Sequence, residues 1–407
     1  MTMKTMITLR DKEGITFARG FEAGGLYCGI RKKKKDLAII KSVVPASVAA
    51  VFTQNKTVAA PVILSRRSLA SGKKATAIIV NSGNANACTG ERGLNDAELM
   101  LATTAAALSV SINEVLVAST GVIGQYLPMD VITPGIEGLA SQLTPTGSDD
   151  AAEAIMTTDT FAKTYAVSFN IGDKEVRIGG IAKGSGMIEP NMATMLAFIT
   201  TDATIEQSLL QTIFARTVTH SFNRISVDGD TSTNDMAAIL ANGCSGISTL
   251  EANTPECELF EAALLQVVTE LAKMIARDGE GATKLIEIEV GGAESDEEAL
   301  KVARSVANSN LVKTAIHGED PNWGRIIAAI GYSGIDLDPE RIELSLNRFP
   351  VLDKQYKIVI DEPVVQQSLK AKDILLSINL NRGSNTTRFW TCDLTKEYVS
   401  INASYRS

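Results

Sequence analysis

The chain has 407 residues, of which 45% are hydrophobic and 21% are charged, and its formal net charge is −8. This length and composition are typical of a soluble globular protein with a sizeable core and room for two domains. The acidic balance argues against nucleic-acid binding, and no run of about 18 apolar residues is present that could span a membrane.

The single strongly basic run is RKKKK at 31–35, followed at once by Asp36. Such a run could bind phosphate or a membrane surface, but one isolated run beside an acid is more typical of a solvated hairpin or loop. The five cysteines are odd in number and contain no CxxC pair, so neither a disulfide framework nor a zinc site is indicated. We therefore expect a reducing, cytoplasmic location, with no signal peptide in the first 14 residues.

Helical and extended patterns alternate along the chain. Apolar residues at three- and four-residue spacing predict helices, and β-branched apolar runs bounded by turn residues predict strands. The alternation predicts an α/β protein of packed helix and sheet layers, with a second, smaller domain from about residue 286. The predicted strands are 36–44, 49–55, 74–83, 114–121, 174–184, 194–200, 342–347, 357–360 and 373–380, and the predicted helices are 94–109, 205–222, 256–277 and 294–307.

An irregular segment runs into a predicted buried strand in the string KGSGMIEPNMATMLAFITTDA at 183–203. Its glycines, together with Pro190 and Asn191, favour turns and unusual backbone angles. Thr194 stands where the irregular part meets the strand at 194–200. A strained turn feeding a rigid strand suits self-cleavage of the chain.

Cleavage before Thr194 would also make this residue a usable nucleophile. If its hydroxyl attacks the Ala193 carbonyl and the resulting ester is hydrolysed, Thr194 acquires a free α-amine beside its own hydroxyl. An α-amine has an ordinary pKa of about 7.7–8.0, so near neutral pH it can take the hydroxyl proton. An Ala-Thr pair alone is common and carries no weight, so the prediction depends on the whole string.

The string KGSGMIEPNMATML closely resembles the self-processing segment of the ornithine acetyltransferase, or glutamate N-acetyltransferase, family, and further matches run along nearly the whole chain. The resemblance implies a layered α-β-β-α sandwich with a smaller C-terminal α/β domain. Residues 1–285 would form the catalytic domain, self-cleaved between Ala193 and Thr194. Residues 286–407 would form the smaller domain, whose tail closes the active site.

The same resemblance implies the reaction. Acetyl would move from N2-acetylornithine to glutamate by a ping-pong route through an acetyl ester on Thr194, in arginine biosynthesis. It also implies a heterotetramer of two copies of each fragment, and it leaves open whether acetyl-CoA is a second donor. No GxxxxGK(S/T) or GxGxxG string is present, so the sequence indicates no organic cofactor, and no metal site is expected. The alternatives are an N-terminal-nucleophile aminopeptidase or amidohydrolase, in which water accepts the acyl group, and a non-catalytic amino-acid sensor that never cleaves.

Four further positions match functional residues of the family. Thr120 and Gly121, in the loop STGVIG after a predicted strand, match its oxyanion pair, although such a loop is by itself more often a plain turn. Lys183 matches a substrate-contacting lysine and would otherwise be an exposed loop lysine. Glu280 lies between glycines after a long predicted helix, where a helix-ending turn is the plain interpretation, and it matches the ligand of the substrate ammonium.

The remaining candidates lie in MTTDT at 156–160 and at the C-terminus. Either Thr157 or Thr158 contacts substrate by the family match, and both stay candidates because adjacent strand residues face opposite ways. Asn402 and Ser407 match the Asn and the terminal hydroxyl residue that close the family's site, although Thr is more usual than Ser at the last position.

Three other strings resemble the family and are interpreted as loops that shape the site: 81–90, 226–235 and 317–325. Asp228 and Asp230 could imitate a metal cluster, but no histidine is near them in sequence, and a capped turn is the safer interpretation. The only histidines are His220 and His317, and no GxSxG motif accompanies them, so a serine–histidine hydrolase is disfavoured.

Overall fold

The computed structural model describes residues 6–72, 74–189 and 195–403, and the chain forms two compact units. The first contains Met1–Asn223 and Thr231–Ile275, and the second contains Arg224–Asp230 and Ala276–Tyr405. The chain is a mixed α/β protein with one sheet in each unit, as the alternating sequence pattern predicts. No helix in the described ranges is both long enough and apolar enough to cross a lipid bilayer.

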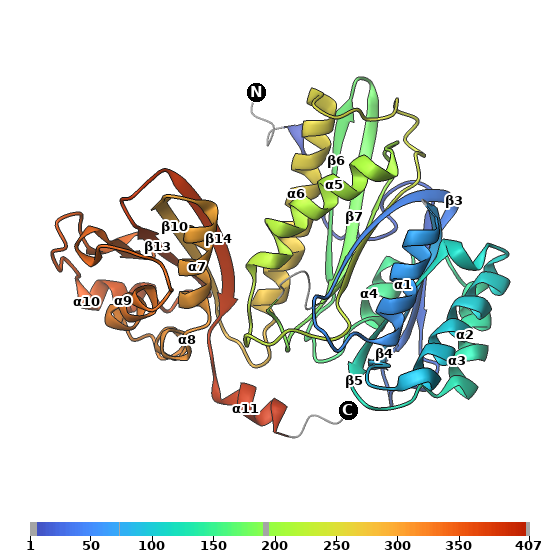
Figure 1. The fold of residues 1–407 in the computed structure, drawn as a ribbon, viewed down its shortest axis with the longest axis horizontal. Coiled ribbons are helices and arrows are strands. Elements are labelled where there is room, and N and C mark those ends of the chain that lie inside the picture. The colour runs from blue at the N-terminus through green and yellow to red at the C-terminus, as the bar shows by residue number, and fades with distance from the viewer. Residues whose placement is uncertain (1–5, 73, 190–194, 404–407) are drawn as a thin grey trace. The chain divides into compact units, whose positions relative to one another are not determined.

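The first unit is organised around a nine-stranded sheet of order β1-β6-β7-β8-β9-β3-β4-β5, with β2 paired to β3 (Figure 1). Most neighbours are antiparallel, whereas β4–β5 and β8–β9 are parallel. The strands are β1 (Thr8–Leu9), β2 (Phe21–Leu26), β3 (Leu37–Phe52), β4 (Lys74–Asn84), β5 (Val115–Val122), β6 (Lys163–Ile171), β7 (Lys174–Lys183), β8 (Leu196–Thr201) and β9 (Met236–Ala241).

Strand β3 joins the two halves of this sheet. The sequence predicts two strands, at 36–44 and 49–55, but the structure has one continuous strand with an irregularity in its pairing between Lys41 and Ala46. Before the irregularity β3 pairs with β2 and β4. After it β3 pairs with the first residues of β4, through Ala46 and Ser47, and with β9 along the rest of its length. A bulge of this kind bends a strand and increases its twist, which allows one strand to belong to both halves.

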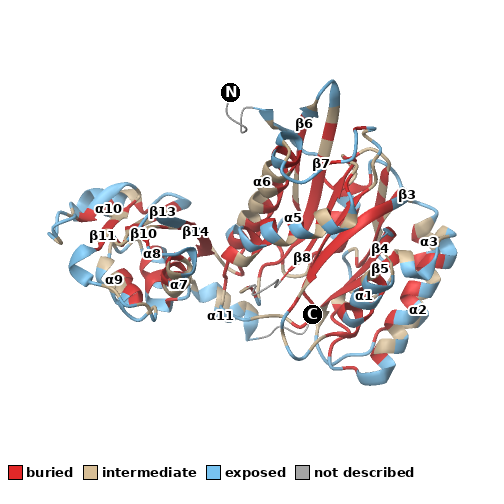
Figure 2. Ribbon diagram, turned by 45° about the horizontal axis from the view of Figure 1, so that its top comes forward, coloured by how far each residue is buried: buried red, intermediate tan, exposed pale blue. Residues whose placement is uncertain are grey.

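Alternating side chains divide the first half of the sheet into two faces. Ile39, Ile79 and Val117 belong to a core shared with the helices α1 (Ala60–Ser71), α2 (Gly90–Leu108) and α3 (Met129–Ala140). The intervening Ile40 and Ile78 belong to a second core, which also contains side chains of β7, β8 and β9. Period-two alternation therefore places this second core between the two halves of the sheet, with buried strands on both sides (Figure 2).

Helices α5 and α6 lie along the other half of the sheet (Figure 1). Gln211 of α5 hydrogen-bonds the backbone of Ala50 on β3, and Gln266 of α6 donates to the Tyr165 hydroxyl on β6 at 3.1 Å. The order helix, sheet, sheet, helix confirms the layered α/β fold. The helices of this unit are α1 (Ala60–Ser71), α2 (Gly90–Leu108), α3 (Met129–Ala140), α4 (Ser148–Ala154), α5 (Gln207–Thr219) and α6 (Pro255–Arg277).

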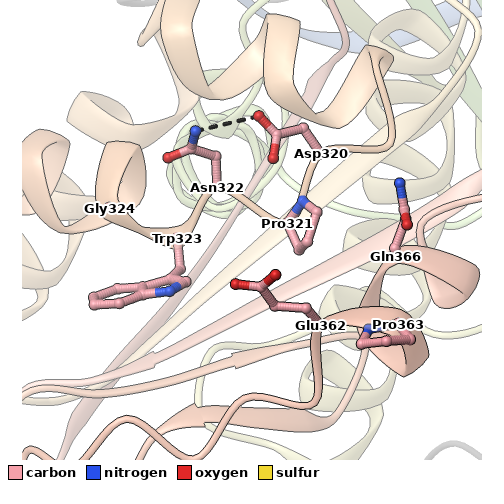
Figure 3. Close-up of a pocket in the computed structure, with 8 residues that line it drawn as sticks. All are labelled: Asp320, Pro321, Asn322, Trp323, Gly324, Glu362, Pro363 and Gln366. Carbon is pink, nitrogen blue, oxygen red and sulfur yellow. Dashed lines mark hydrogen bonds between the residues drawn. The ribbon is translucent and has the colours of Figure 1, made fainter.

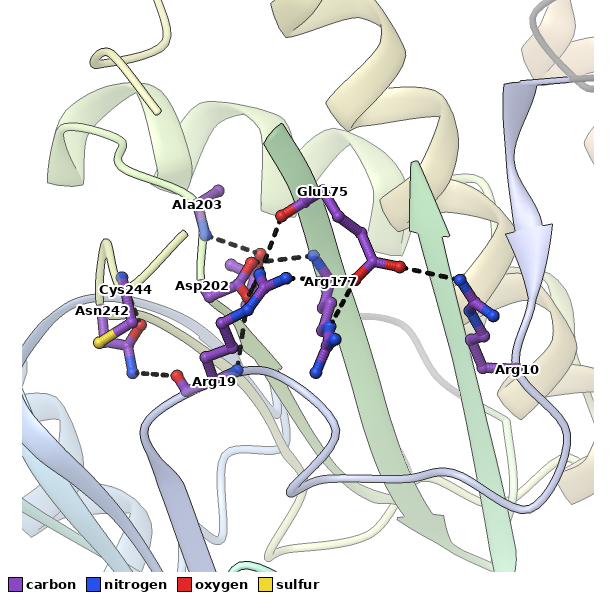
Figure 4. A network of polar contacts seen from close by, with 9 residues as sticks. Arg10, Arg19, Glu175, Arg177, Asp202, Ala203, Asn242 and Cys244 are labelled. Atoms are coloured by element: carbon purple, nitrogen blue, oxygen red, sulfur yellow. Dashed lines mark hydrogen bonds and ion pairs between the residues drawn. The ribbon is translucent and has the colours of Figure 1, made fainter. Parts of the chain in front are cut away.

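A polar network ties the N-terminal segment to the ends of β7 and β8 (Figure 4). Arg19 donates to Asp202 at 2.6 Å and to Glu175 at 3.1 Å, and Arg10 reaches the other oxygen of Glu175 at 2.8 Å. The backbone N–H of Arg177 also donates to the buried Asp202 carboxylate, at 2.8 Å. The Asp202 contacts lie at the C-terminal end of β8, which is the opposite end of the strand from Leu196.

The second unit has a five-stranded sheet of order β12-β11-β13-β10-β14 around a single apolar core. The predicted strand at 357–360 is wrong: Ile358 makes only an isolated bridge to Leu352, and the segment's Ile358 and Val359 side chains are exposed. Its strands are β10 (Leu285–Ala293), β11 (Glu343–Leu346), β12 (Phe349–Leu352), β13 (Asp373–Asn379) and β14 (Asn385–Cys392), and its helices are α7 (Asp296–Ala307), α8 (Asn310–His317), α9 (Trp323–Gly331), α10 (Glu362–Ser368) and α11 (Lys396–Asn402).

Candidate active site

The predicted nucleophile Thr194 and its neighbour Ala193 lie outside the described residues, but the strand that follows them is described. Met195 is buried, and its carbonyl accepts a hydrogen bond from the backbone N–H of Met236 at 3.1 Å. Leu196 then begins β8, where it lies opposite Lys183 of β7 on one side and Met236 of β9 on the other. The chain directly after Thr194 is therefore held in the middle of a buried sheet.

Lys183 and Thr120, which are 63 positions apart in sequence, meet in the structure. The Lys183 Nζ donates to the Thr120 hydroxyl oxygen at 3.1 Å, and only 8% of each residue is exposed. Because this oxygen accepts from the ammonium, the hydroxyl hydrogen is left to donate elsewhere. The pair can therefore present a polarised hydroxyl donor to an anionic oxygen.

Gly121, the residue after Thr120, has a backbone conformation that only glycine can adopt at this position. Its φ is +132°, and a Cβ built on it would lie 2.2 Å from the carbonyl carbon of Gly83. The β4–β5 pairing becomes irregular at the same place, between Gly83 and Asn84. Close backbone approach, rather than flexibility, therefore explains the glycine at this position.

Two loops with family-like sequences fix the backbone just before Thr120. Asn234 is buried, and its side-chain amide donates to the Ser119 carbonyl at 2.9 Å and to the Ala85 carbonyl at 2.5 Å. The Ser119 hydroxyl in turn donates to the Asn81 side chain at 2.6 Å. Parts of the strings at 81–90 and 226–235 are thus brought to the candidate oxyanion loop.

A buried ion pair lies beside Lys183. The side chains of Asp159 and Lys163 are fully buried and 2.6 Å apart, and Asp159 also accepts from the Gly184 backbone N–H at 2.7 Å. Burial raises the pKa of the Asp159 carboxyl, but the charges of Lys163 and Lys183 and these hydrogen bonds outweigh burial and hold the pKa well below its usual range. Asp159 is therefore an ionised carboxylate that neutralises part of the positive charge around Lys183.

The two candidate threonines next to Asp159 do not lie on a strand, so the expectation that they face opposite sides of one is wrong. Residues 157 and 158 form a bend, because the Asp159 carboxylate accepts the Thr157 N–H at 2.9 Å. Arg31 holds the same segment from the other side, donating to the Met156 carbonyl at 2.8 Å and to the Thr157 carbonyl at 3.1 Å. The basic run is a loop between antiparallel β2 and β3, as expected, and its first residue braces this bend.

Asp235, the last residue of the string at 226–235, is a second buried carboxyl near Lys183. It directly precedes β9 and accepts hydrogen bonds from Ser232 and from the Met195 backbone. Its Oδ2 is buried and has no hydrogen-bond partner in the described part of the chain. Burial raises the pKa of Asp235 well above its usual value, with Lys183 and the hydrogen bonds opposing. An unsatisfied buried oxygen of this kind costs about 1–3 kcal/mol.

In the second unit, the structure brings Glu280 and Asn402 together. Glu280 lies in the turn after α6, with 8% of its surface exposed, and the Asn402 amide donates to its Oε2 at 2.7 Å. Thr395 caps the N-terminus of α11 and also donates to the Gly281 carbonyl at 2.8 Å. The helix that ends at Asn402 is thereby fastened to the Glu280 turn. Ser407 lies outside the described residues.

Other groups of this unit support the same turn. Asp393 accepts the Thr283 and Lys284 backbone N–H groups at 2.7 and 2.8 Å, and His317 lies 3.0 Å from its other oxygen. His317 therefore braces the loop after Glu280. The Asp230 N–H donates to Asp228 at 3.4 Å, in agreement with the expected capped turn.

The string at 317–325 also lines a separate pocket of about 600 Å³ (Figure 3). None of the site residues expected from the family resemblance lines this pocket. Its lining residues are Asp320, Pro321, Asn322, Trp323, Gly324, Glu362, Pro363 and Gln366.

The layered fold, the lysine-polarised hydroxyl and the constrained glycine are features of an acyltransferase. The model of the ArgJ family matches residues 22–407. The arginine biosynthesis bifunctional protein ArgJ of Streptococcus mutans is 50% identical over 95% of this chain and 97% of its own length. The protein of the same name from Caldanaerobacter subterraneus is 48% identical over 97% of this chain and 98% of its own length. The chain therefore belongs to the ArgJ family.

Two solved structures are also similar. One is the arginine biosynthesis bifunctional protein ArgJ from Bacillus halodurans, which is 48% identical, covers 46% of this chain and 98% of the solved chain, and has a TM-score of 0.44. The other is ornithine acetyltransferase complexed with ornithine from Mycobacterium tuberculosis, which is 39% identical, covers 46% of this chain and 100% of the solved chain, and has a TM-score of 0.44.

Proposed function

We propose that this protein is a self-processing acetyltransferase that moves acetyl from N2-acetylornithine to glutamate. The catalytic domain is 1–285, cleaved between Ala193 and Thr194, and the C-terminal domain is 286–407. The observation that carries the proposal is the Lys183–Thr120 pair beside Leu196, two residues after the expected nucleophile. Membership of a family whose members are named as arginine biosynthesis bifunctional proteins supports this reaction.

In the first half-reaction, the free α-amine of Thr194 takes the proton of its own hydroxyl, and the hydroxyl oxygen attacks the acetyl carbonyl of N2-acetylornithine. The Thr120 hydroxyl and the Gly121 N–H donate to the oxyanion that forms. Lys183 holds the Thr120 oxygen at 3.1 Å, so this donor is oriented before the substrate arrives. The amine then gives its proton to the departing nitrogen of ornithine.

In the second half-reaction, the α-amine of glutamate attacks the acetyl ester, and the Thr194 hydroxyl is regenerated. The two half-reactions use the same donors, because each forms an oxyanion on the same acetyl carbon. Ornithine leaves before glutamate enters, which predicts ping-pong kinetics with parallel reciprocal plots.

Recognition requires an anionic group for the substrate ammonium and cationic or neutral donors for its carboxylate. Glu280, held by Asn402, supplies the anion, while Lys183 and a threonine at 157 or 158 supply donors. Ser407 closes the site as a further hydroxyl contact. These roles follow the family resemblance residue by residue and are supported by the burial of Glu280 and Lys183.

The proposal also includes the assembly of the two fragments and a second acetyl donor. Two copies of each fragment form a heterotetramer in the cytoplasm, which light scattering of the purified enzyme can test. The word "bifunctional" in the names of the relatives favours acetyl-CoA as an additional donor for glutamate. An assay with acetyl-CoA and glutamate alone decides this point.

The experiment for the main proposal is a denaturing gel with N-terminal sequencing, followed by a transfer assay. Two fragments are expected, the second beginning TMLAF, and labelled acetyl should pass from N2-acetylornithine to glutamate. A Thr194→Ala variant should stay intact and inactive. An intact but active wild type would refute the nucleophile; intact and inactive protein would indicate a sensor, and acetate release independent of glutamate would indicate a hydrolase.

A further inference from the structure

The lysines of the basic run at 31–35 have no role in the reaction described above, and the structure places the start of this run beside the candidate site. The run forms the loop between the antiparallel strands β2 and β3. The chain as a whole has a net charge of −8, so five consecutive cations differ sharply from its overall charge. A surface of this kind attracts anions to its neighbourhood.

Arg31 fixes the start of this loop against the candidate oxyanion residues. Its aliphatic stem lies on Gly83 of β4, where a Cβ would be only 2.6 Å from the Arg31 Cγ. Gly83 lies opposite Gly121, the residue after Thr120, in the β4–β5 pairing. The Arg31 guanidinium then donates to the Thr157 carbonyl at 3.1 Å. The loop therefore begins beside both the oxyanion residues and a candidate substrate threonine.

The end of the loop is fixed as well. The Lys35 ammonium lies 2.5 Å from Asp150 and 2.8 Å from Glu153, both on α4. The buried Asp36 carboxylate accepts the Arg31 backbone N–H at 2.8 Å, which joins the two ends of the loop. These contacts hold both ends in place, so the three lysines between them are presented at a defined position.

These three residues, Lys32, Lys33 and Lys34, form the lysine tip of the loop. All three are exposed, and in the part of the chain that the structure describes none of their side chains is in an ion pair. Three neighbouring ammonium groups fit a ligand with several phosphate groups, because each phosphate carries strong acceptor oxygens and negative charge. A ligand with one carboxylate would need only one of the three.

We propose that the lysine tip binds the phosphate groups of acetyl-CoA when this donor supplies acetyl to glutamate. Acetyl-CoA carries its acetyl thioester at one end and a diphosphate and a ribose phosphate at the other, so the two ends need separate binding surfaces. N2-acetylornithine carries no phosphate and does not use these lysines. The inference rests on the proposed function, and in particular on acetyl-CoA as the second donor.

The test uses the purified, self-cleaved enzyme with Lys32→Gln, Lys33→Gln and Lys34→Gln combined in one triple variant. The KM for acetyl-CoA should rise about tenfold at low salt, because each exposed ion pair contributes modestly and three are lost. Transfer from N2-acetylornithine to glutamate should stay within about twofold of wild type, because exposed charges that touch no substrate contribute little.

A matched control removes the same charge from another surface. It combines Lys354→Gln, Lys357→Gln and Lys370→Gln, at three exposed positions of the second unit, and should change neither reaction.

A second thioester separates phosphate binding from a structural role of the loop. S-acetylpantetheine carries the same thioester without any phosphate, so wild type and the triple variant at 32–34 should use it equally. The wild-type preference for acetyl-CoA over S-acetylpantetheine should fall about tenfold in that variant, and it should also fall in wild type at high salt, where exposed charges are screened.

The possible outcomes distinguish this inference from the proposed function. A triple variant at 32–34 with the wild-type KM for acetyl-CoA would overturn the inference. An equal loss with both thioesters would also overturn it, because it would assign the lysines to the structure of the loop. Wild type that transfers acetyl from N2-acetylornithine but not from acetyl-CoA would overturn the inference and leave the transferase in place. Wild type that transfers acetyl from neither donor would refute the proposed function itself.

Discussion

Asp159→Asn tests the charge balance around Lys183 most sharply. Asp159 and Lys163 are both fully buried, 2.6 Å apart, and the carboxylate also accepts two backbone N–H groups. The substitution leaves the Lys163 ammonium buried without this carboxylate and turns an amide N–H₂ toward a cation. Removing one partner of a buried pair costs about 3–5 kcal/mol, and we expect a loss of that size in the first unit.

The tryptophans make this measurement specific. The sequence has two tryptophans, Trp323 and Trp390, and both lie in the second unit. Their fluorescence in urea should therefore be unchanged, while hydrogen exchange of β6 and β7 amides should accelerate in line with the lost stability. The control Asp150→Asn removes an exposed partner of Lys35 and should cost about 1 kcal/mol or less.

A double variant measures the coupling energy between Asp159 and Lys163. Asp159→Asn combined with Lys163→Met should lose about 1–3 kcal/mol less than the two single variants together, because the second substitution removes the ammonium that has lost this carboxylate. The Asp159 pKa is lowered on folding, so its contribution is present above its unfolded pKa of about 3.9 and is lost as pH falls below that value. Additive single variants, or stability that does not depend on pH below 4, would refute the reasoning.

Three further outcomes are expected. Glu280→Gln should cleave normally but lose about 1.5–3 kcal/mol in kcat/KM for N2-acetylornithine, because a charged hydrogen bond is lost. The control Glu397→Gln, at an exposed position on α11, should keep the wild-type kcat/KM. A Glu280→Gln enzyme with wild-type kinetics would refute the assignment. Thr120→Val should lower acetyl transfer by about 10²–10³-fold with the fold intact, and a variant within threefold of wild type would exclude an oxyanion role. Gly121→Ala should fail to mature or unfold at lower temperature, because a Cβ would lie 2.2 Å from the Gly83 backbone; unchanged melting and cleavage would contradict this.

The sequence predicts elements whose signal is local. Helices α2, α5, α6 and α7 have strong three- and four-residue periodicity and are found close to their expected limits. Strand β3 shows where local signals fail, because the turn-like VVPAS in its middle suggests a break. The structure carries the strand through that segment, since pairing with β4 before it and with β9 after it compensates for the exposed bend. The KIVI string at 357–360 has strand composition, but its pairing with β12 is limited to the isolated bridge between Leu352 and Ile358.

The candidate site likewise contains residues that the sequence identifies and residues that only the structure reveals. Motif resemblance identifies Thr120, Gly121 and Lys183, and the structure adds that the lysine holds the threonine hydroxyl. Asp159 and Asp235 could not be identified in advance, because an aspartate in TTDT or TSTND is most often a turn-capping residue. Only long-range packing buries these carboxyls beside Lys183, and no single-sequence pattern encodes such burial.

The most direct test of the account is the intact mass of each fragment after incubation with N2-acetylornithine and no glutamate. An acetyl ester on Thr194 should add about 42 Da to the fragment 194–407 alone, and adding glutamate should remove it. A Thr194→Ser enzyme, which keeps the hydroxyl, should show the same addition after cleavage. Turnover with both fragments unmodified at every time point, or acetyl found on fragment 1–193, would contradict a covalent Thr194 intermediate.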